Sequence, residues 1–151
     1  SSLFVNLLKR ELKINSADAF RIYNSKFKYI QFDFTDSEIP IVDSYDIIIL
    51  CNILHFLNTN QRNLILNWSI KHLNCNGLMF IRANHKENQE IILNATRKET
   101  IGEETKFSNE LGKGYFLIEL KDLQIDSNEV IELNNLRERT SEYFTAVYKK
   151  Q

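Results

Sequence analysis

A cysteine, an asparagine and a histidine follow the most apolar stretch of the chain. The run Asp46–Cys51 reads Asp-Ile-Ile-Ile-Leu-Cys, Asn52 comes next, and His55 lies three residues further on. Ligands of α/β proteins bind at the carboxyl ends of sheet strands, so Cys51 and Asn52 are predicted to line a cleft. There His55 could take a proton from a hydroxyl or a thiol. The alternatives are that Cys51 is a buried apolar side chain and that His55 only helps to begin a helix.

Four further residues are candidates for contact with a substrate. Arg82 and His85 lie at the end of a second apolar run and just after it, where they could meet an acidic group. A solvated loop is the alternative for both. Tyr115 and Phe116 could form one wall of a substrate pocket, although a packing role explains an aromatic pair equally well.

The charge balance and the cysteines argue against several classes of function. Lys and Arg number 19 and Asp and Glu number 20, and a net charge of -1 disfavours a general nucleic-acid or membrane-surface binder. No apolar run approaches the ~20 residues of a membrane span. Cys51 and Cys75 have neither metal-ligand spacing nor a disulfide pattern, which predicts a reducing, cytoplasmic setting and no metal site. We find no nucleophile elbow, phosphate loop or nucleic-acid motif.

The centre of the chain predicts a strand, a helix and a second strand. The unbroken β-branched run Asp46–Cys51 is typical of a strand that is buried on both faces, as in a parallel sheet. Helix-capping residues at 58–60 precede a helix over Gln61–Leu73, which places Leu66, Ile70 and Leu73 on one face. Gly77 is predicted to adopt a left-handed turn before the strand Leu78–Arg82. This order is a βαβ unit, and such units are right-handed.

The flanking segments complete the predicted sheet. Helices are expected over Leu3–Leu12 and Ala17–Tyr23, followed by a strand over Lys28–Phe34. We expect the strand Asp46–Cys51 to pair in parallel with both Lys28–Phe34 and Leu78–Arg82.

The carboxyl-terminal third predicts a helix over Lys86–Thr96, a polar stretch from Arg97 to Lys113, and an antiparallel pair of strands, Glu129–Leu133 and Tyr143–Lys149. Four glycines and one proline leave little room for linkers, so residues 1–151 are expected to form a single domain. The predicted fold class is α/β, with a mainly parallel Rossmann-like sheet, helices on both faces and a carboxyl-terminal antiparallel hairpin.

Several short motifs occur in order along about two thirds of the chain. A strand that ends in Asp33 is followed by a loop with Pro40 and by the apolar strand Tyr45–Leu50, which opens with an aromatic–Asp pair. The apolar helix start Ile53–Leu57 comes next, and its helix leads to the Gly-containing turn and strand Leu73–Ile81. The aromatic segment Gly114–Phe116, followed by Glu119–Leu120, ends the series. Together they resemble the class I S-adenosylmethionine-dependent methyltransferases, with the small-molecule enzymes of the tellurite- and thiopurine-resistance kind as the nearest group.

The resemblance implies methyl transfer from S-adenosylmethionine to a small-molecule acceptor. Asp33 would accept a hydrogen bond from the adenine amino group, and proximity and orientation would supply most of the acceleration. The implied residues are Asp33, Phe34, Cys51 and Asn52 for the cofactor, His55 for catalysis, and Arg82, Tyr115 and Phe116 for the acceptor.

One departure from the family pattern concerns the cofactor. No glycine precedes Gly77, so the first strand and its glycine loop are expected to be missing or degenerate, and cofactor affinity is expected to be weak or absent. The opening Ser1-Ser2 suggests a fragment or a processed chain. Without the first strand, either another chain or the strand Lys28–Phe34 is expected to cover the edge beside Asp46–Cys51. The alternative functions are a non-catalytic methyltransferase-like domain that binds or stabilises a protein partner, and a nucleoside-binding module.

Overall fold

The computed structural model describes residue 39 and residues 43–151, which belong to one compact unit, Phe34–Gln151. The predicted elements Leu3–Leu12, Ala17–Tyr23 and Lys28–Phe34 lie outside the described residues, as do Asp33 and Phe34. Within the described part, none of the helices is long and apolar enough to cross a membrane.

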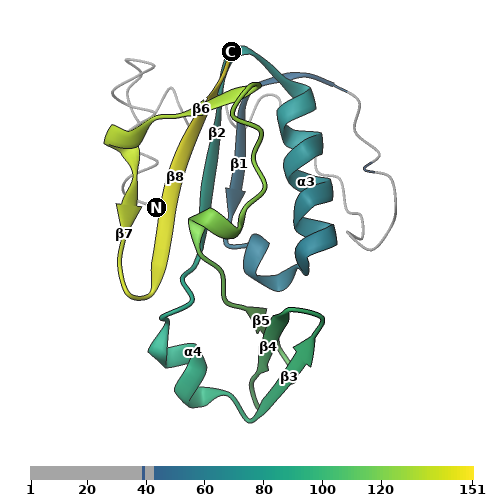
Figure 1. Cartoon of the computed structure of the whole chain (residues 1–151), viewed down its shortest axis with the longest axis vertical. Coiled ribbons are helices and arrows are strands. Elements are labelled where there is room, and N and C mark those ends of the chain that lie inside the picture. The colour runs from purple at the N-terminus through teal and green to yellow at the C-terminus, as the bar shows by residue number, and fades with distance from the viewer. Residues whose placement is uncertain (1–38, 40–42) are drawn as a thin grey trace, which may run out of the picture. The chain divides into compact units, whose positions relative to one another are not determined.

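The larger of two sheets is formed by five strands (Figure 1). Its order is β1 (Tyr45–Cys51), β2 (Leu73–Asn84), β8 (Tyr143–Lys150) and β6 (Val130–Glu132), and β7 (Glu138–Arg139) also pairs with β8. The pair β1–β2 is parallel, whereas β8 is antiparallel to β2, β6 and β7. This confirms the parallel pairing of the two central strands and the antiparallel carboxyl-terminal pair. Among the described strands, the mainly parallel sheet is therefore confirmed only for β1 and β2.

One face of β1 is buried in the core and the other is open. Ile48 and Leu50 are buried and join the main apolar cluster together with Leu66 and Ile70 of the neighbouring helix. Ile49 points to the opposite face and is 44% exposed. The prediction that this strand is buried on both faces is thus wrong for the described residues, because they place a helix over only one face.

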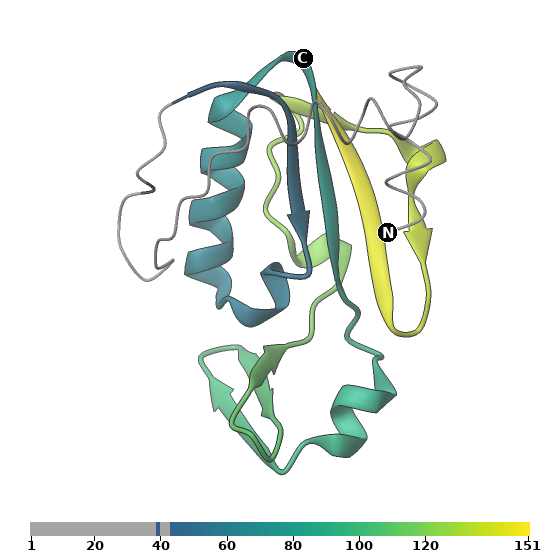
Figure 2. The ribbon, with the colours of Figure 1, turned by 180° about the vertical axis from the view of Figure 1, so that it is seen from behind.

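The helix α3 (Thr59–His72) connects the two parallel strands, as the sequence predicts. The side chain of Asn58 accepts a hydrogen bond from the N–H of Gln61, and the Gln61 side chain accepts one from the N–H of Asn58, both at 3.0 Å. This capping box fixes where the helix begins. Figure 2 shows α3 alongside β1, at the opposite end of the row of strands from β7.

A serine inside α3 gives a first testable prediction. Ser69 is fully buried, and its hydroxyl has no hydrogen-bond partner among the described residues. Ser69→Ala removes an unsatisfied hydroxyl and adds helix propensity, so we expect the free energy of unfolding to rise by about 1 kcal/mol. Urea denaturation measures the change, and Ser127→Ala at an exposed position is the matched control. A loss of stability in Ser69→Ala would mean that the hydroxyl is bonded.

The turn between α3 and the outer part of β2 differs from the prediction by one residue. Tyr45 pairs with Leu73 and Ile47 with Leu78, so residues 74–77 bulge out of the register. The left-handed residue is Asn76, with φ 64°, and not Gly77. Asparagine tolerates this conformation better than most residues, which leaves Gly77 for another need. A Cβ at Gly77 would lie 2.8 Å from the Asn74 carbonyl oxygen.

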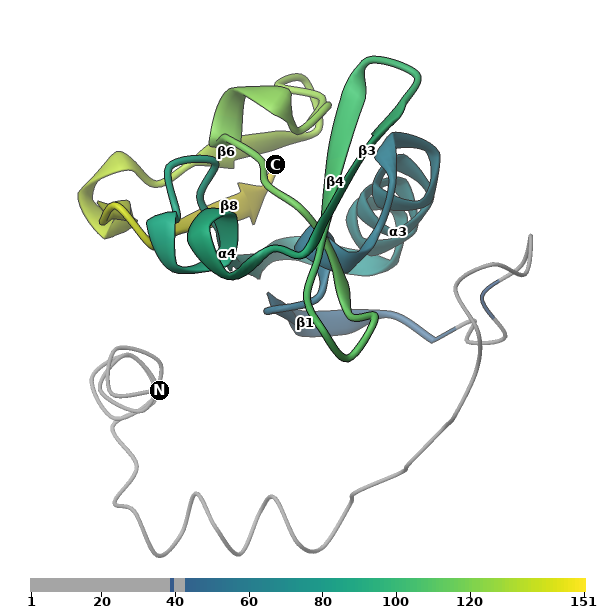
Figure 3. The same cartoon turned by 90° about the horizontal axis from the view of Figure 1, so that it is seen from below.

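The smaller sheet and a short helix lie beyond the carboxyl end of β1 (Figure 1). Figure 3 shows β3 and β4 side by side, with α4 to one side. The elements are α4 (Gln89–Asn94), β3 (Arg97–Ile101), β4 (Glu104–Ser108) and β5 (Gly114–Phe116), and the antiparallel strand order is β3-β4-β5.

Two sequence expectations for this region need correction. The helix predicted over Lys86–Thr96 is only six residues long, and the stretch Arg97–Lys113, read as merely polar, forms a hairpin. The hairpin closes with a two-residue turn at 102–103, where Gly102 has φ 63°. Glycine at the first position of a two-residue turn matches the twist of the flanking strands. The region begins and ends at one point, because His85 and Ile118 form an isolated bridge.

Candidate functional site

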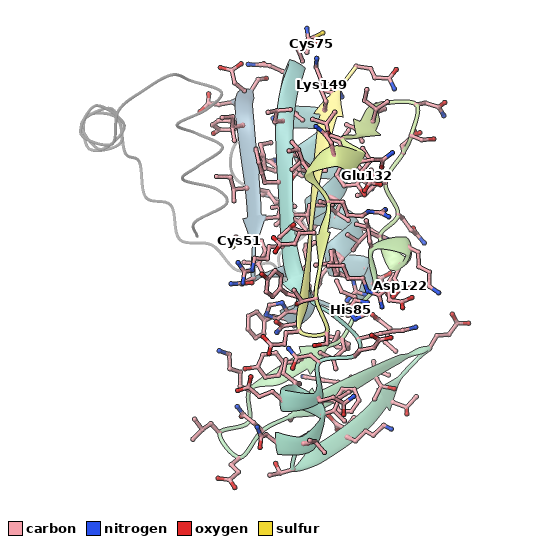
Figure 4. The ribbon with its side chains drawn as sticks, turned by 90° about the vertical axis from the view of Figure 1, so that its left-hand side faces the viewer. Cys51, Cys75, His85, Asp122, Glu132 and Lys149 are labelled. Atoms are coloured by element: carbon pink, nitrogen blue, oxygen red, sulfur yellow. The ribbon has the colours of Figure 1, made fainter. Side chains whose placement is uncertain are left out.

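The carboxyl end of β1 is open and its backbone turns sharply. Cys51 is exposed, so the interpretation of this residue as a buried apolar side chain is wrong. Asn52 is also exposed and has φ 59°, and its N–H donates to the Arg82 carbonyl oxygen at 2.8 Å. Figure 4 shows Cys51 and His85 toward one end of the sheet and Cys75 at the other. Cys51 and Asn52 therefore lie at the carboxyl end of β1, and their place in the wall of a cleft stays a prediction.

His55 is buried directly below this strand end. It belongs to the 3-10 helix η1 (Leu54–Phe56) and is 3% exposed. Its Nδ1 accepts a hydrogen bond from the N–H of Asn84 at 3.2 Å, which leaves the ring proton on Nε2. Burial, and next the charge of Lys113, lower the pKa of His55 to about 4. At neutral pH the ring is therefore uncharged, and its Nε2 carries a proton and cannot take up another.

Three rings and one ammonium group gather at this point, and we call them the aromatic cluster. Its members are His55, Phe56, Tyr115 and Lys113. The ring of His55 lies 4.3 Å from that of Phe56 and 5.8 Å from that of Tyr115, and the last two rings are 5.2 Å apart, centroid to centroid. The Lys113 ammonium lies 5.0 Å from the Phe56 centroid and 5.7 Å from the Tyr115 centroid, which is cation–π distance.

The short loop between β4 and β5 holds Lys113 in place. The side-chain oxygen of Asn109 accepts the N–H groups of Leu111 and Lys113, both at 3.0 Å. The backbone of Asn109 also bonds to Gly112 and to Lys113. Gly112 has φ 75°, which the tight loop requires and which glycine adopts without strain. Four hydrogen bonds within five residues therefore fix the point from which the Lys113 side chain departs.

Of the aromatic pair, only Tyr115 faces the cluster. Phe116 is 6% exposed and buried, as its packing alternative predicts. Tyr115 is half-buried, and β5 packs against η1 so that its ring meets His55 and Phe56. Tyr115 also lines a cavity of about 130 Å³, together with Glu90, Ile91, Asn94, Phe107, Ser108 and Asn109.

Arg82 and His85 are not in a solvated loop. Arg82 lies within β2, and its guanidinium stacks 3.9 Å from the centroid of the Tyr143 ring. Its Nε atom is buried without a hydrogen-bond partner among the described residues, as is the hydroxyl of Thr145, its neighbour on β8. His85 is 2% exposed, and its Nδ1 accepts the N–H of Glu87 at 3.3 Å. Because β2 continues to Asn84, Arg82 is held by the sheet, and His85 is buried just after the last residue of the strand.

Known proteins were compared with the chain by sequence and by structure. No protein-family model and no curated protein matches the sequence. A crystal structure of an S-adenosylmethionine-dependent methyltransferase from Clostridium acetobutylicum ATCC 824 is similar to 89% of this chain, with a TM-score of 0.61 and 12% identity. The PH0226 protein from Pyrococcus horikoshii OT3 is similar to 90% of it, with a TM-score of 0.65 and 10% identity. The chain has a class I methyltransferase-like fold.

The chain spans 69% and 65% of the lengths of these two structures. At 10–12% identity the similarity is one of fold, and it does not transfer an acceptor or a cofactor. In this methyltransferase-like fold the aromatic cluster lies near the carboxyl end of β1, and α/β proteins bind ligands at the carboxyl ends of their strands.

An ion pair ties the small sheet of the methyltransferase-like fold to α3. Arg62 of α3 is 3% exposed and pairs with the carboxylate of Glu104 on β4. The other oxygen of Glu104 accepts the N–H of Thr59 at 2.8 Å, at the first turn of the helix. Burial opposes ionisation of Glu104, but the hydrogen bonds from Arg62 and Thr59 outweigh it and lower the pKa of the carboxyl. The pair holds the sheet that carries Lys113 and Tyr115.

Sequence reasoning did not find Phe56, Lys113 or the pair Arg62–Glu104. Their signals are weak, because a lysine after a glycine and a glutamate after a turn are common on any surface. No group of three or more His, Cys, Asp or Glu side chains within metal-binding reach occurs in residues 43–151.

Proposed function

We propose that this chain binds S-adenosylmethionine at the carboxyl end of β1 and directs its methyl group to a small-molecule acceptor held at the aromatic cluster. The observation that carries the proposal is the open strand end, where the exposed Cys51 and the left-handed Asn52 stand next to buried His55. The chain has a methyltransferase-like fold, and ligands of such α/β proteins bind at the carboxyl ends of the parallel strands.

Each residue has a proposed part in this function. Asp33 and Phe34 contact the adenine, and Cys51 and Asn52 form the side of the cleft that the described strand supplies. The bound cofactor supplies a methyl group on a positively charged sulfur, which needs an oriented acceptor more than it needs a base. Tyr115 forms the acceptor wall and Phe116 supports it from the core.

The proposed part of His55 is to orient the acceptor. With Nδ1 occupied by the Asn84 N–H and the pKa lowered to about 4, its Nε2–H remains to donate to an acceptor oxygen. Arg82 is proposed to add positive charge near the same strand end, since it pairs with Cys51 across the sheet.

We further propose that residues 1–151 form a single α/β domain with a mainly parallel sheet and helices on both faces. Two unpaired cysteines fit a reducing, cytoplasmic setting.

Calorimetry with S-adenosylhomocysteine tests the proposed function. No glycine precedes Gly77 to let a backbone approach the cofactor, so we expect measurable but weak binding, with a dissociation constant above about 10 µM. Asp33→Ala should weaken it at least about tenfold, the value of one good hydrogen bond to a charged group. Asp43→Ala, at an exposed position, is the matched control.

The missing glycine turn favours one alternative, a non-catalytic methyltransferase-like domain that binds a protein partner. Complete absence of S-adenosylhomocysteine binding would support this alternative and refute methyl transfer by the chain. Submicromolar binding would instead show that another segment does the work of the glycine loop.

A further inference from the structure

We propose that the acceptor bound at the aromatic cluster is an aromatic carboxylate. This inference rests on the proposed function and names the class of its acceptor. Three observations carry it: an ammonium group without an ion-pair partner in the described part of the chain, a histidine that can only donate, and two aromatic rings with accessible surface.

The first observation is the charge of Lys113. Its ammonium group stands over the rings of Phe56 and Tyr115, and it has no ion pair with any residue in the described part of the chain. By contrast, Lys86 and Lys121 share the carboxylate of Glu119, each at 2.8 Å. The loop around Asn109 fixes the backbone of Lys113. A cation that is held beside a ligand surface and lacks a carboxylate is suited to an anionic ligand.

The second observation excludes acceptors that must lose a proton to a base. The Nδ1 lone pair of His55 is used by the Asn84 N–H, so the ring offers a donor, Nε2–H, and no acceptor. His55 cannot take the proton of a phenol or an amine, which are protonated at neutral pH, whereas a carboxylic acid, with a pKa of about 4, is already ionised. The carboxylate oxygen then forms a bond to the methyl carbon as the carbon–sulfur bond breaks. The products are a neutral methyl ester and a neutral thioether, and no proton is released.

The third observation concerns shape. Phe56 is 36% exposed and Tyr115 is half-buried, with centroids 5.2 Å apart and planes inclined by 40°. Two inclined ring faces accept a flat ring in an offset or edge-to-face arrangement. The ring of the ligand therefore lies on Phe56 and Tyr115, while its carboxylate meets Lys113 and the Nε2–H of His55.

A titration of the isotope-labelled full chain with benzoate, followed by NMR, tests the acceptor class without any cofactor. We expect saturable shifts at the Lys113 amide and the His55 ring, with a dissociation constant of about 1 mM, the usual range for so small a ligand. The neutral isostere benzamide and the ringless anion acetate should each bind at least about tenfold more weakly.

Variants of two lysines sharpen the test. Lys113→Gln should weaken benzoate binding at least about tenfold, and Lys113→Arg should restore it. Lys98→Gln is the matched control, because Lys98 also lies over an aromatic ring, that of Phe107 at 5.6 Å, outside the cluster. Unchanged melting temperatures show that the variants fold.

The pH dependence separates two origins of binding. With a pKa of about 4 for His55, benzoate affinity should stay constant between pH 5 and 8. Affinity that rises as the pH falls through 6.5 would mean that a protonated His55 attracts the anion, and it would overturn the base-free argument. Equal binding of benzoate and benzamide, or no effect of Lys113→Gln, would overturn the acceptor class. If the chain binds S-adenosylhomocysteine but does not bind benzoate, the proposed function stands and only this inference is refuted.

Discussion

Replacing Glu104 by alanine is expected to lower the free energy of unfolding by about 2 kcal/mol, because the carboxylate is partly exposed but its removal leaves the buried Arg62 guanidinium without a charge partner. Arg62 is 3% exposed, so its guanidinium cannot turn to water when the carboxylate is removed. The N–H of Thr59 at the first turn of α3 loses its acceptor as well. Urea denaturation of the two proteins measures the difference.

Three further variants show whether charge or packing is responsible. Glu104→Gln keeps an acceptor and should cost less than Glu104→Ala. Arg62→Met combined with Glu104→Met removes both charges and should be more stable than Glu104→Ala alone. Glu99→Ala is the matched control, because its pair with Arg97 is exposed and should contribute less than about 1 kcal/mol. A loss in Glu104→Ala no larger than that in Glu99→Ala would show that the pair with Arg62 contributes no more than an exposed one.

The same pair predicts how stability depends on pH. The pKa of Glu104 is lower in the folded protein than its ordinary value of 4.5, so its contribution is complete above pH 4.5 and is lost as the pH falls further. Protonation of His55 affects stability at higher pH. Its pKa falls from 6.5 to about 4 on folding, so the unfolded chain takes up this proton first and stability declines between those values. Glu104→Gln should therefore flatten only the part of the acid-denaturation curve below pH 4.5.

Gly77→Ala is expected to cost about 2 kcal/mol, within the range for forcing an extra methyl group into a filled space. The new Cβ would lie 2.8 Å from the carbonyl oxygen of Asn74 and 3.0 Å from that of Asp46. Both atoms belong to the backbone, so the bulge between β1 and β2 must shift as a whole. The change appears as a lower midpoint in urea denaturation.

Two other positions separate contact from conformation. Asn76→Gly removes the strain of a left-handed non-glycine residue but raises the conformational entropy of the unfolded chain. The two effects should nearly cancel, so the free energy of unfolding should change by less than about 0.5 kcal/mol. Gly102→Ala meets no atom within 4 Å and carries only the cost of its positive φ, about 1 kcal/mol. If Gly77→Ala were tolerated as well as Asn76→Gly, the close approach of the backbone at Gly77 would be wrong.

The parts of the fold that were predicted from sequence are those with a strong local pattern. The apolar run of β1, the capping residues and apolar face of α3, and the alternation of β8 each identify an element by themselves. The hairpin β3–β4 was missed because β3 is mostly exposed on both faces and neither strand shows a period of apolar residues. Asn76 and Gly77 both accept a left-handed turn, and only the distance to the next strand decides between them.

The candidate site was predicted in part for the same reason. Cys51 is the last residue of a strand and Asn52 follows it, so the strand prediction by itself places both at the carboxyl end of the sheet. The chemistry of His55 depends on Asn84, which is 29 residues away in sequence, so no local pattern carries it. Lys113 enters the site only because β5 packs against η1, which is a tertiary contact.

The bridge between His85 and Ile118 has an evolutionary consequence. The N–H of Lys86 donates to the carbonyl oxygen of Ile118 at 3.1 Å, so the chain departs from the main sheet and returns to it side by side. Segments whose two ends are adjacent are the ones that proteins gain, lose and exchange most readily. Duplication and recombination can thus replace the whole excursion, with Lys113 and Tyr115 on it, while β1, β2 and β8 keep their register. If the proposed acceptor site is correct, a chimaera joined at these two residues is expected to take the ligand preference of the protein that donates the segment.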